Sequence, residues 1–419
     1  MAGGRPPVTE QFEQRLRSWL GKPELVAPCR ESVARNLEAS PIYLRDLGRL
    51  LERFAIHGCE ASYTKLCRQL SRCDAFVRDR LLPRAREGYR LPGELYASHL
   101  LANGVEMSPG ELVSRSRVDL KRTLREMRVL ARHLGGESSL LGEVLRNLGK
   151  QRIPGERIVS HYQERVGALR ELIEGRGILT LPELEVRVVA ATAAESARMP
   201  FPHVPFPRVI GASAEPIEIV LPLLRSPQGG EISGSMDAGS ESASWSVAAH
   251  EASHAIQFAA LRASGVPLAR ALFGSMSECE GWAVYLETEL ICDLPPAARM
   301  ISLRSHLLRC ARTILEVEIQ QGIRSPAEAE RVLCDDVGLT AAAARQELAR
   351  FLLMPGQAPS APYGYTRHLE LLAETELALG RRFYRRRYHD FLLAQGLAPL
   401  ALVRQRVLEQ FVPKVRQQP

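Results

Sequence analysis

The sequence lacks the features that mark membrane, secreted and redox proteins. No apolar stretch approaches the about 20 uncharged residues that a membrane-spanning helix needs, and no apolar segment follows the start MAGGRPP as it does in a signal peptide. The eight cysteines form no C-x-x-C pair, and an even number of cysteines indicates disulfides only in a secreted protein. We therefore expect a cytoplasmic protein with reduced thiols and no membrane partner.

Lysine is scarce as well. Five of the 55 basic residues are lysines, which leaves 50 arginines, and the net charge is +7. This bias is typical of a GC-rich genome and does not by itself indicate nucleic-acid binding. The arginine-rich stretch 381–387 is interpreted as the solvated face of a helix rather than a nucleic-acid patch. No nucleic-acid partner is expected.

The spacing of apolar residues predicts a mainly helical protein with a small β-sheet. Residues 1–180 repeat apolar positions three and four apart, which indicates helices. Residues 181–240 contain two β-rich stretches, EVRVV and IEIVL, and lead into a Gly/Ser-rich loop over Gly229–Ser242. Residues 241–419 are helical again. The expected fold is α+β with these three regions, in which helical halves flank a cleft and residues 1–180 form one wall.

The pattern H-E-x-x-H occurs once, at His250, Glu251 and His254. Side chains four apart lie on one face of a helix, so both imidazoles can reach one metal ion. The glutamate between them can act as general base on a water molecule at the metal. The alternative interpretation is a surface helix that happens to carry two histidines.

A zinc hydrolase of this kind needs a third ligand, and a second predicted helix offers four glutamates. Glu280 and Glu278 lie 26 and 24 positions after the second histidine, and either spacing fits two antiparallel helices joined by a turn. Glu280 is the preferred ligand. Cys279 points about 100° away from Glu280 on a helix and is disfavoured. Glu287 and Glu289 are interpreted as solvated or structural carboxylates.

Several strings resemble one bacterial family, catalogued as domain of unknown function 885. They are the H-E-x-x-H motif, E-G-W-A-x-Y-x-E over Glu280–Glu287, PGQA over Pro355–Ala358 with LEL after it, and the closing segment Phe383–Val407. The resemblance covers most of the chain beyond about residue 90. It implies a gluzincin-like fold and a zinc-dependent peptidase, often carboxypeptidase-like. It also implies that His389 is a neutral histidine held by hydrogen bonds.

The chain departs from the family at the first motif. The family usually has H-E-x-x-P-G-H-H-x-Q, whereas this chain reads HEASHAIQ. The Pro-Gly pair is missing, which restores plain H-E-x-x-H spacing. Gln257 is kept and is assigned to substrate binding.

A second departure concerns the substrate side of the site. A family tyrosine and arginine correspond to Ala361 and Leu372 here. The tyrosine would donate to an oxyanion and the arginine would hold a substrate carboxylate. In the stretch 355–367, interpreted as a loop, Tyr363 or Tyr365 would replace the tyrosine and Arg367 the arginine.

Gluzincin-like folds also place a small sheet just before the metal-binding helix, and its edge can pair with an extended substrate. Pro216–Leu224 is the candidate for that edge. The alternative is a purely structural hairpin.

The resulting hypothesis is a zinc hydrolase that cleaves a peptide or small amide, with one Zn²⁺ held by His250, His254 and Glu280. It would be either carboxypeptidase-like or a specialised biosynthetic amidase. Two alternatives stay open. Two histidines and a carboxylate also suit non-haem iron in an oxygenase, and the lost tyrosine and arginine allow a non-catalytic binding protein.

Overall fold

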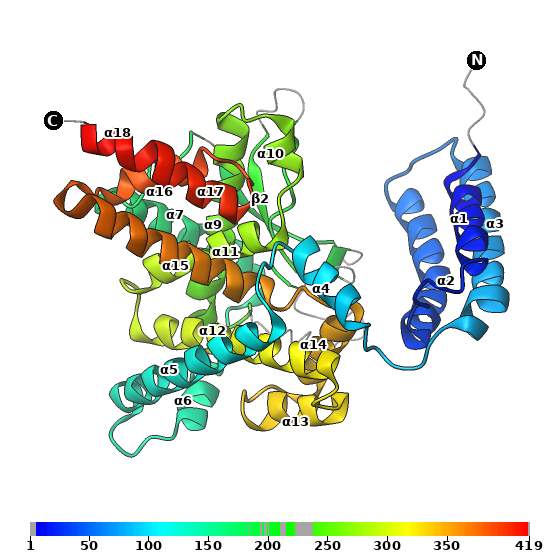
Figure 1. Ribbon diagram of the computed structural model, residues 1–419, viewed down its shortest axis with the longest axis horizontal. Helices are drawn as coiled ribbons and strands as arrows, with labels where there is room; N and C mark the ends of the chain where they lie inside the picture. Colours follow the sequence, from blue (N-terminus) through cyan, green and yellow to red (C-terminus); the bar gives the residue numbers. More distant parts are fainter. Residues whose placement is uncertain are drawn as a thin grey trace. The chain divides into compact units, whose positions relative to one another are not determined.

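The computed structural model of the chain describes residues 6–183, 185–192, 195–196, 199, 201–209, 215–222 and 238–417. It divides into two compact units, Met1–Arg90 and Leu91–Pro419. The first unit consists of helices α1 (Val8–Leu20), α2 (Arg30–Arg53) and α3 (Glu60–Phe76), followed by a π-helical turn over Val77–Leu81 (Figure 1). Its core centres on Val33, Leu81 and Ala85.

The second unit holds the remaining elements. Its helices before the sheet are α4 (Gly93–Ala102), α5 (Pro109–Gly135), α6 (Leu141–Leu148) and α7 (Ile158–Arg176). Its helices after the sheet are α9 (Glu241–Ala263), α10 (Leu268–Leu272), α11 (Met276–Ile291), α12 (Pro296–Gln321), α13 (Pro326–Asp335), α14 (Ala341–Leu353), α15 (Ser360–Leu379), α16 (Arg385–Leu393), α17 (Leu400–Arg406) and α18 (Val412–Gln417).

Local sequence signals set several of these helix ends. Ser108 and Glu111 form a reciprocal capping box at the start of α5. Pro109 occupies the first helical position, where the N–H that proline lacks would have no partner within the helix. Gly177 and Gly322 end α7 and α12 in the left-handed conformation, with φ of 59° and 72°. Glycine adopts that conformation without steric cost.

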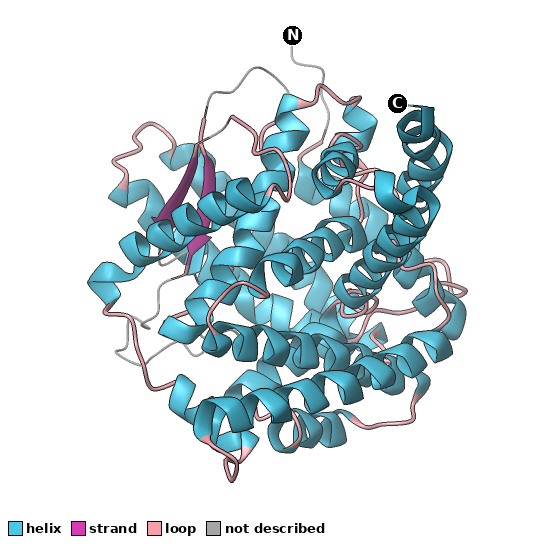
Figure 2. Cartoon of the chain, turned by 90° about the vertical axis from the view of Figure 1, so that its left-hand side faces the viewer, coloured by secondary structure: helices cyan, strands magenta, loops and turns pink. Residues whose placement is uncertain are grey.

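Two strands, β1 (Val186–Ala190) and β2 (Ile217–Leu221), form the sheet, which Figure 2 shows as one small pair beside the helices. They pair in parallel, with Val186 opposite Ile217. The alternative of a hairpin between them is therefore wrong, because a parallel pair needs a crossover and the connection is long enough to make one. On β2, His203 forms an antiparallel bridge with Val220. Of the loop expected over Gly229–Ser242, residues 229–237 lie outside the described residues.

Helix α9 is the central helix of the second unit. Eighteen of its 23 residues are buried, so it is covered on all faces. Many of them are alanine or serine, which lets neighbouring backbones approach closely. Helices α7, α11 and α12 pack against it, and α11 packs in turn against α15. At that crossing Gly281 faces Gly364 so closely that a Cβ on Gly364 would lie 2.0 Å from the backbone oxygen of Ser277.

The structure confirms a mainly helical protein with a small sheet. The division between its compact units, however, falls at Arg90 rather than near residue 180. The helices of 91–180 belong to the second unit because α5 packs along α12 and α7 packs against α9. No helix among the described residues is long and apolar enough to cross a membrane.

Candidate metal centre

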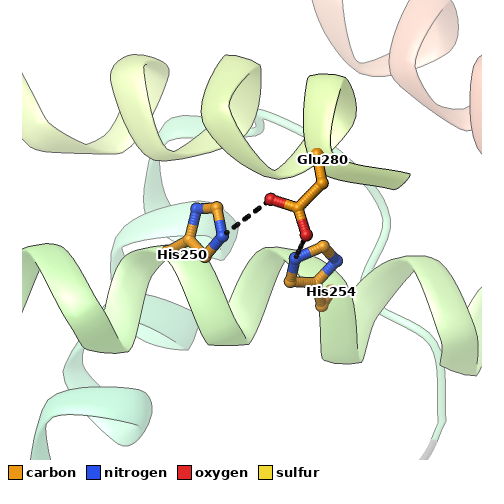
Figure 3. A group of neighbouring side chains, drawn as sticks. All are labelled: His250, His254 and Glu280. Carbon is orange, nitrogen blue, oxygen red and sulfur yellow. Dashed lines mark ion pairs between the residues drawn. The ribbon is translucent and has the colours of Figure 1, made fainter. Parts of the chain in front are cut away.

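Figure 3 shows that His250 and His254 project from adjacent turns of α9 toward Glu280, which projects from α11. The Nε2 atoms of His250 and His254 lie 3.7 and 3.8 Å from the two carboxylate oxygens of Glu280. One ligand atom from each residue falls within 4.8 Å of the others. Helix geometry explains the arrangement, because residues four apart share a face and α11 packs directly on α9.

These distances fit a metal ion. In a tetrahedral zinc site with ligands at about 2.0–2.1 Å, neighbouring ligand atoms lie about 3.4 Å apart. The two nitrogen–oxygen separations, each to a different oxygen of Glu280, exceed that value by a few tenths of an ångström, and the three ligand atoms as a set lie within 4.8 Å of one another. The two histidines are buried, whereas the Glu280 side chain is 28% exposed, so solvent reaches the cluster from the glutamate side.

Glu287, two turns after Glu280 on α11, holds the other ring nitrogen of His250. Its Oε2 lies 3.2 Å from Nδ1 of His250 and accepts a hydrogen bond from Arg309 at 3.1 Å. Its Oε1 accepts hydrogen bonds from Ser246 at 2.8 Å and from Ser302 at 2.9 Å. A carboxylate on the far nitrogen of a ligating histidine fixes the tautomer and turns Nε2 toward the metal.

The charges around Glu287 set the protonation of the cluster. Burial would raise the pKa of Glu287, but Arg309 and His250 outweigh it and lower that pKa to about 2. Burial would lower the pKa of His250, but its contacts with Glu280 and Glu287 raise it to about 9. The His250 site thus favours positive charge, which a bound cation would also supply.

Glu251 lies beside this cluster. Its side chain is buried, and Oε2 has no hydrogen-bond partner among the described residues. Burial raises its pKa to about 7, with the Glu280 and Glu287 charges acting in the same direction. A buried carboxylate oxygen without a partner is costly in a folded protein. A bound water molecule would supply the missing donor.

His254 differs from His250 in its surroundings. Its Nδ1 is buried without a hydrogen-bond partner in the described structure, and burial lowers its pKa to about 4. Gln257, one turn further along the same face of α9, is also buried, and its Oε1 lacks a partner there too. Gln257 lines a small pocket with Trp282 and His368, and its assignment to substrate binding stays a prediction.

The other acidic and thiol candidates do not join the cluster. The carboxylate of Glu278 turns back to cap α11, where it accepts a hydrogen bond from the backbone of Ser275. Burial raises the pKa of Cys279 to about 12, which disfavours the thiolate that a metal needs. Glu289 forms an ion pair with Arg385 at 2.5 Å.

The expected loop over 355–367 is wrong in its second half, because α15 begins at Ser360. Tyr363, Tyr365 and Arg367 therefore lie on a helix. Pro362 fits in the first turn of α15, because a backbone N–H in that turn would have no intrahelical partner. Gly364 allows α15 to cross α11 closely.

The contacts of these three side chains are with residues outside the metal-ligand cluster. Tyr363 is buried in a cluster with Tyr96 and Leu100, and Arg367 lies over its ring at 5.0 Å and pairs with Glu370 at 2.5 Å. Tyr365 is buried against His306, with ring centroids 5.4 Å apart. The roles predicted for them stay predictions.

The strings that resemble the family pack against one another. The indole N–H of Trp282 donates to the backbone oxygen of Ser253 at 3.1 Å. His389 is fully buried between the Tyr285 hydroxyl at 2.7 Å and the Ile178 backbone oxygen at 2.8 Å. Burial lowers its pKa to about 4, so it is the neutral, hydrogen-bonded histidine that was expected. The second motif thus supports the helix that carries the first.

A cavity of about 870 Å³ lies between α5, α12 and α13, with an apolar floor that includes Leu124 and Leu315. Glu318 in its wall pairs with Arg117 at 2.7 Å and Arg324 at 2.6 Å. None of the residues of the metal-ligand cluster lines it. It is therefore a separate feature from the candidate centre.

Sequence reasoning missed the support around His250. Glu287 was interpreted as solvated or structural; it is structural rather than solvated, being 1% exposed, and its contact with His250 was not predicted. One signal could have found it, because Glu280 and Glu287 are seven apart and share a face of α11. Arg309 carried no signal, since it is one of 50 arginines.

The comparisons with known proteins show a family and a fold. The sequence profile of the family described as "Bacterial protein of unknown function (DUF885)" matches residues 4–407. No curated protein matches the chain. A putative lipoprotein from Colwellia psychrerythraea has a similar structure, with a TM-score of 0.72 and 19% identity over 85% of this chain and 61% of that one. A putative lipoprotein of unknown function from Shewanella oneidensis matches with a TM-score of 0.71 and 19% identity over 97% of this chain and 80% of that one. The chain thus spans about three-fifths of the length of the Colwellia protein, and both likenesses show the fold alone.

Proposed function

The chain belongs to this bacterial family of unknown function, DUF885, and on that premise we propose that it is a zinc-dependent hydrolase that cleaves a peptide or other amide bond. The observation that carries the proposal is the combination of the three clustered ligand atoms with Glu251 beside them. Two imidazoles and one carboxylate leave a coordination position open, as hydrolytic zinc sites do. A gluzincin-like metallopeptidase relationship and a cytoplasmic location are parts of the same proposal.

His250, His254 and Glu280 would hold the ion, with Glu287 fixing the ring of His250. Bound zinc would lower the pKa of a water molecule and polarise the amide carbonyl. Glu251 would take the proton of the attacking water through its unpartnered oxygen. It would then deliver that proton to the leaving nitrogen. The neutral Gln257 would donate to the substrate from the next turn of α9.

The same donor set could bind iron, and a non-haem iron oxygenase is therefore the main alternative to the zinc hydrolase. Glu251 favours hydrolysis, because a buried carboxylate beside the ligands serves proton transfer from water. An oxygenase would need oxygen for turnover, whereas amide hydrolysis would proceed without it.

Elemental mass spectrometry of purified protein tests the proposal. We expect about one zinc per chain in the wild type and in Glu251→Gln, and little zinc in Glu280→Ala. Glu374→Ala, which removes an exposed ion pair with Arg404, is the control that should keep its zinc. Iron in place of zinc would support the oxygenase, and a wild type that binds no metal after zinc is supplied would sink the enzyme proposal.

A second experiment measures the hydrolysis of a library of peptides and N-acyl amino acids. Glu251→Gln should keep zinc but lose activity by about 100-fold to 10,000-fold, the usual contribution of a general base. Unchanged hydrolysis by that variant would remove Glu251 from its role.

A further inference from the structure

The cavity of about 870 Å³ between α5, α12 and α13 has the volume of a ligand-binding site. Its lining contains one face of each of two neighbouring helices, because the lining residues recur three or four positions apart. On α5 they are Arg117, Leu120, Leu124, Arg128 and Ala131, and on α12 they include Leu307, Ala311, Leu315 and Glu318. The cavity therefore follows both helices lengthwise.

The two helices run antiparallel along the cavity. Arg117, near the start of α5, pairs at 2.7 Å with Glu318, near the end of α12. Met127, further along α5, packs in one core cluster with Leu307, further back on α12. At 1.5 Å per residue, the stretch of α5 that lines the cavity is about 20 Å long, or about four helical turns. The cavity thus has the length of a groove for one further helix.

The floor of the cavity is apolar and offers few hydrogen bonds. Leu315 and Ala311 are buried, and the buried carboxylate of Glu318 is already paired with Arg117 and Arg324. An extended peptide on this floor would leave backbone N–H and C=O groups without partners, which is costly. A helix pairs these groups within itself, and an acyl chain has none. The floor therefore favours a helix or an acyl chain.

Charges of both signs on the rim favour the helix. Arg128 and Arg132 on α5 are exposed, as are Asp335 and Asp336 at the end of α13 and Glu137 after α5. None of these five side chains forms an ion pair within the described part of the chain. An acyl chain carries charge only at its head and would match one sign. A helix whose apolar face is flanked by acidic and basic residues matches both.

We propose that this cavity is the docking site for an amphipathic helix of a partner protein. The apolar face of that helix packs on the floor, with its acidic residues toward Arg128 and Arg132. Its basic residues lie toward Asp335 and Asp336. The docked helix also covers Leu140, which lines the cavity and is 66% exposed. Insertion of an amphipathic helix into an apolar groove is a recurring mode of recognition, and this site is independent of the proposed hydrolase.

Fluorescence anisotropy with designed peptides tests the proposal. The probe is a labelled, stapled helical peptide of about 16 residues, with leucines on one face and glutamate and lysine on opposite flanks. One control peptide has the same residues in an order that forms no apolar face. Two others keep the leucines but carry only glutamate or only lysine. The probe should bind the wild type about tenfold or more tightly than the first control, because its leucines become buried, and more tightly than either single-sign peptide.

Variants of the cavity locate the binding. Arg128→Glu combined with Arg132→Glu should weaken binding of the probe by about fivefold to tenfold, because two favourable charge contacts become repulsive. The matched control is Lys121→Glu with Arg125→Glu, an exposed pair of the same spacing on α5 that does not line the cavity. It should bind the probe as the wild type does. Leu124→Glu, which places a charge on the floor, should weaken binding by about tenfold or more.

Thermal unfolding and zinc content are measured for each variant, and both should stay close to the wild-type values in the exposed double variants. Equal binding of the probe and the first control peptide, or undiminished binding by the Arg128 and Arg132 double variant, overturns the docking site. A single-sign peptide that binds as tightly as the probe overturns the charge assignment. Hexadecanoate that binds the wild type but not Leu124→Glu, while the probe fails to bind, assigns the cavity to an acyl chain instead. A wild type without zinc overturns the hydrolase and leaves this proposal standing.

Discussion

The two compact units of the chain differ in how completely they bury their helices. Helix α1 of the first unit has no buried residue among its 13, whereas α9 of the second has 18 buried among 23. The first unit exposes large apolar side chains such as Val8, Tyr43 and Phe54. Dense packing around α9 takes side chains such as Glu251 out of bulk water, which raises the pKa of that carboxyl. The candidate site therefore lies where the chain packs most tightly.

Gly364→Ala should have the largest effect on stability. The new Cβ would lie 2.0 Å from the backbone oxygen of Ser277 and 2.7 Å from Cα of Gly281, and two backbones cannot yield as a side chain can. We expect a loss of about 3 kcal/mol in the free energy of unfolding, measured by chemical denaturation. A loss below about 1 kcal/mol would mean that α11 and α15 are not tightly packed.

Glu316→Gln should change how the stability of the second unit depends on pH. Burial raises the pKa of Glu316 to about 7, so the folded state holds a proton that the unfolded state releases near pH 4.5. The free energy of unfolding then falls as the pH rises between those values, by about 2–3 kcal/mol from this group. The wild type should lose that much more stability than the variant from pH 5 to 8. Parallel denaturation profiles for the two proteins would contradict the prediction.

Glu287→Gln should weaken zinc binding tenfold to 100-fold, the usual cost of losing such a supporting carboxylate. The hydroxyls of Ser246 and Ser302 can rotate to accept from the new amide, so the fold should survive. Competition with a zinc-chelating dye measures the affinity. Glu289→Gln, two residues along α11, should bind zinc as the wild type does, and equal affinity in both variants would remove the role of Glu287.

Gly48→Ala in the first unit should have the smallest effect. Its new Cβ would lie 2.6 Å from the Tyr63 hydroxyl, which can move at the cost of its 2.8 Å hydrogen bond to the Leu44 backbone oxygen. Alanine is a better helix former by up to about 1 kcal/mol, which offsets that cost. We expect a net change within about 0.5 kcal/mol. A loss comparable to that of Gly364→Ala would erase the contrast between the units.

The sequence predicted the cluster of His250, His254 and Glu280 because local geometry decides it. Residues four apart share a helix face, and a turn between two helices limits which carboxylate can return to that face. That rule left both Glu278 and Glu280 open, and it is the structure that assigns Glu278 to the cap of α11.

Features that depend on tertiary packing could not be predicted in this way. The burial of Glu287 requires α12 to bring Ser302 and Arg309 against α11, which no local pattern encodes. The parallel pairing of the strands depends on a long crossover rather than on their residues. The proline and glycine residues of 355–367 indicated a loop. In the structure, however, Pro362 lies in the first turn of α15, and Gly364 lies where α15 crosses α11 closely.

The short span of chain that builds the cluster has a consequence for folding. The clustered side chains and their hydrogen-bonded support come from α9, α11 and α12, between Ser246 and Arg309. Loop closure over such short separations costs little conformational entropy. We therefore expect this three-helix segment to acquire zinc before the rest of the chain has docked, and to be the last part to exchange its amide hydrogens once zinc is bound.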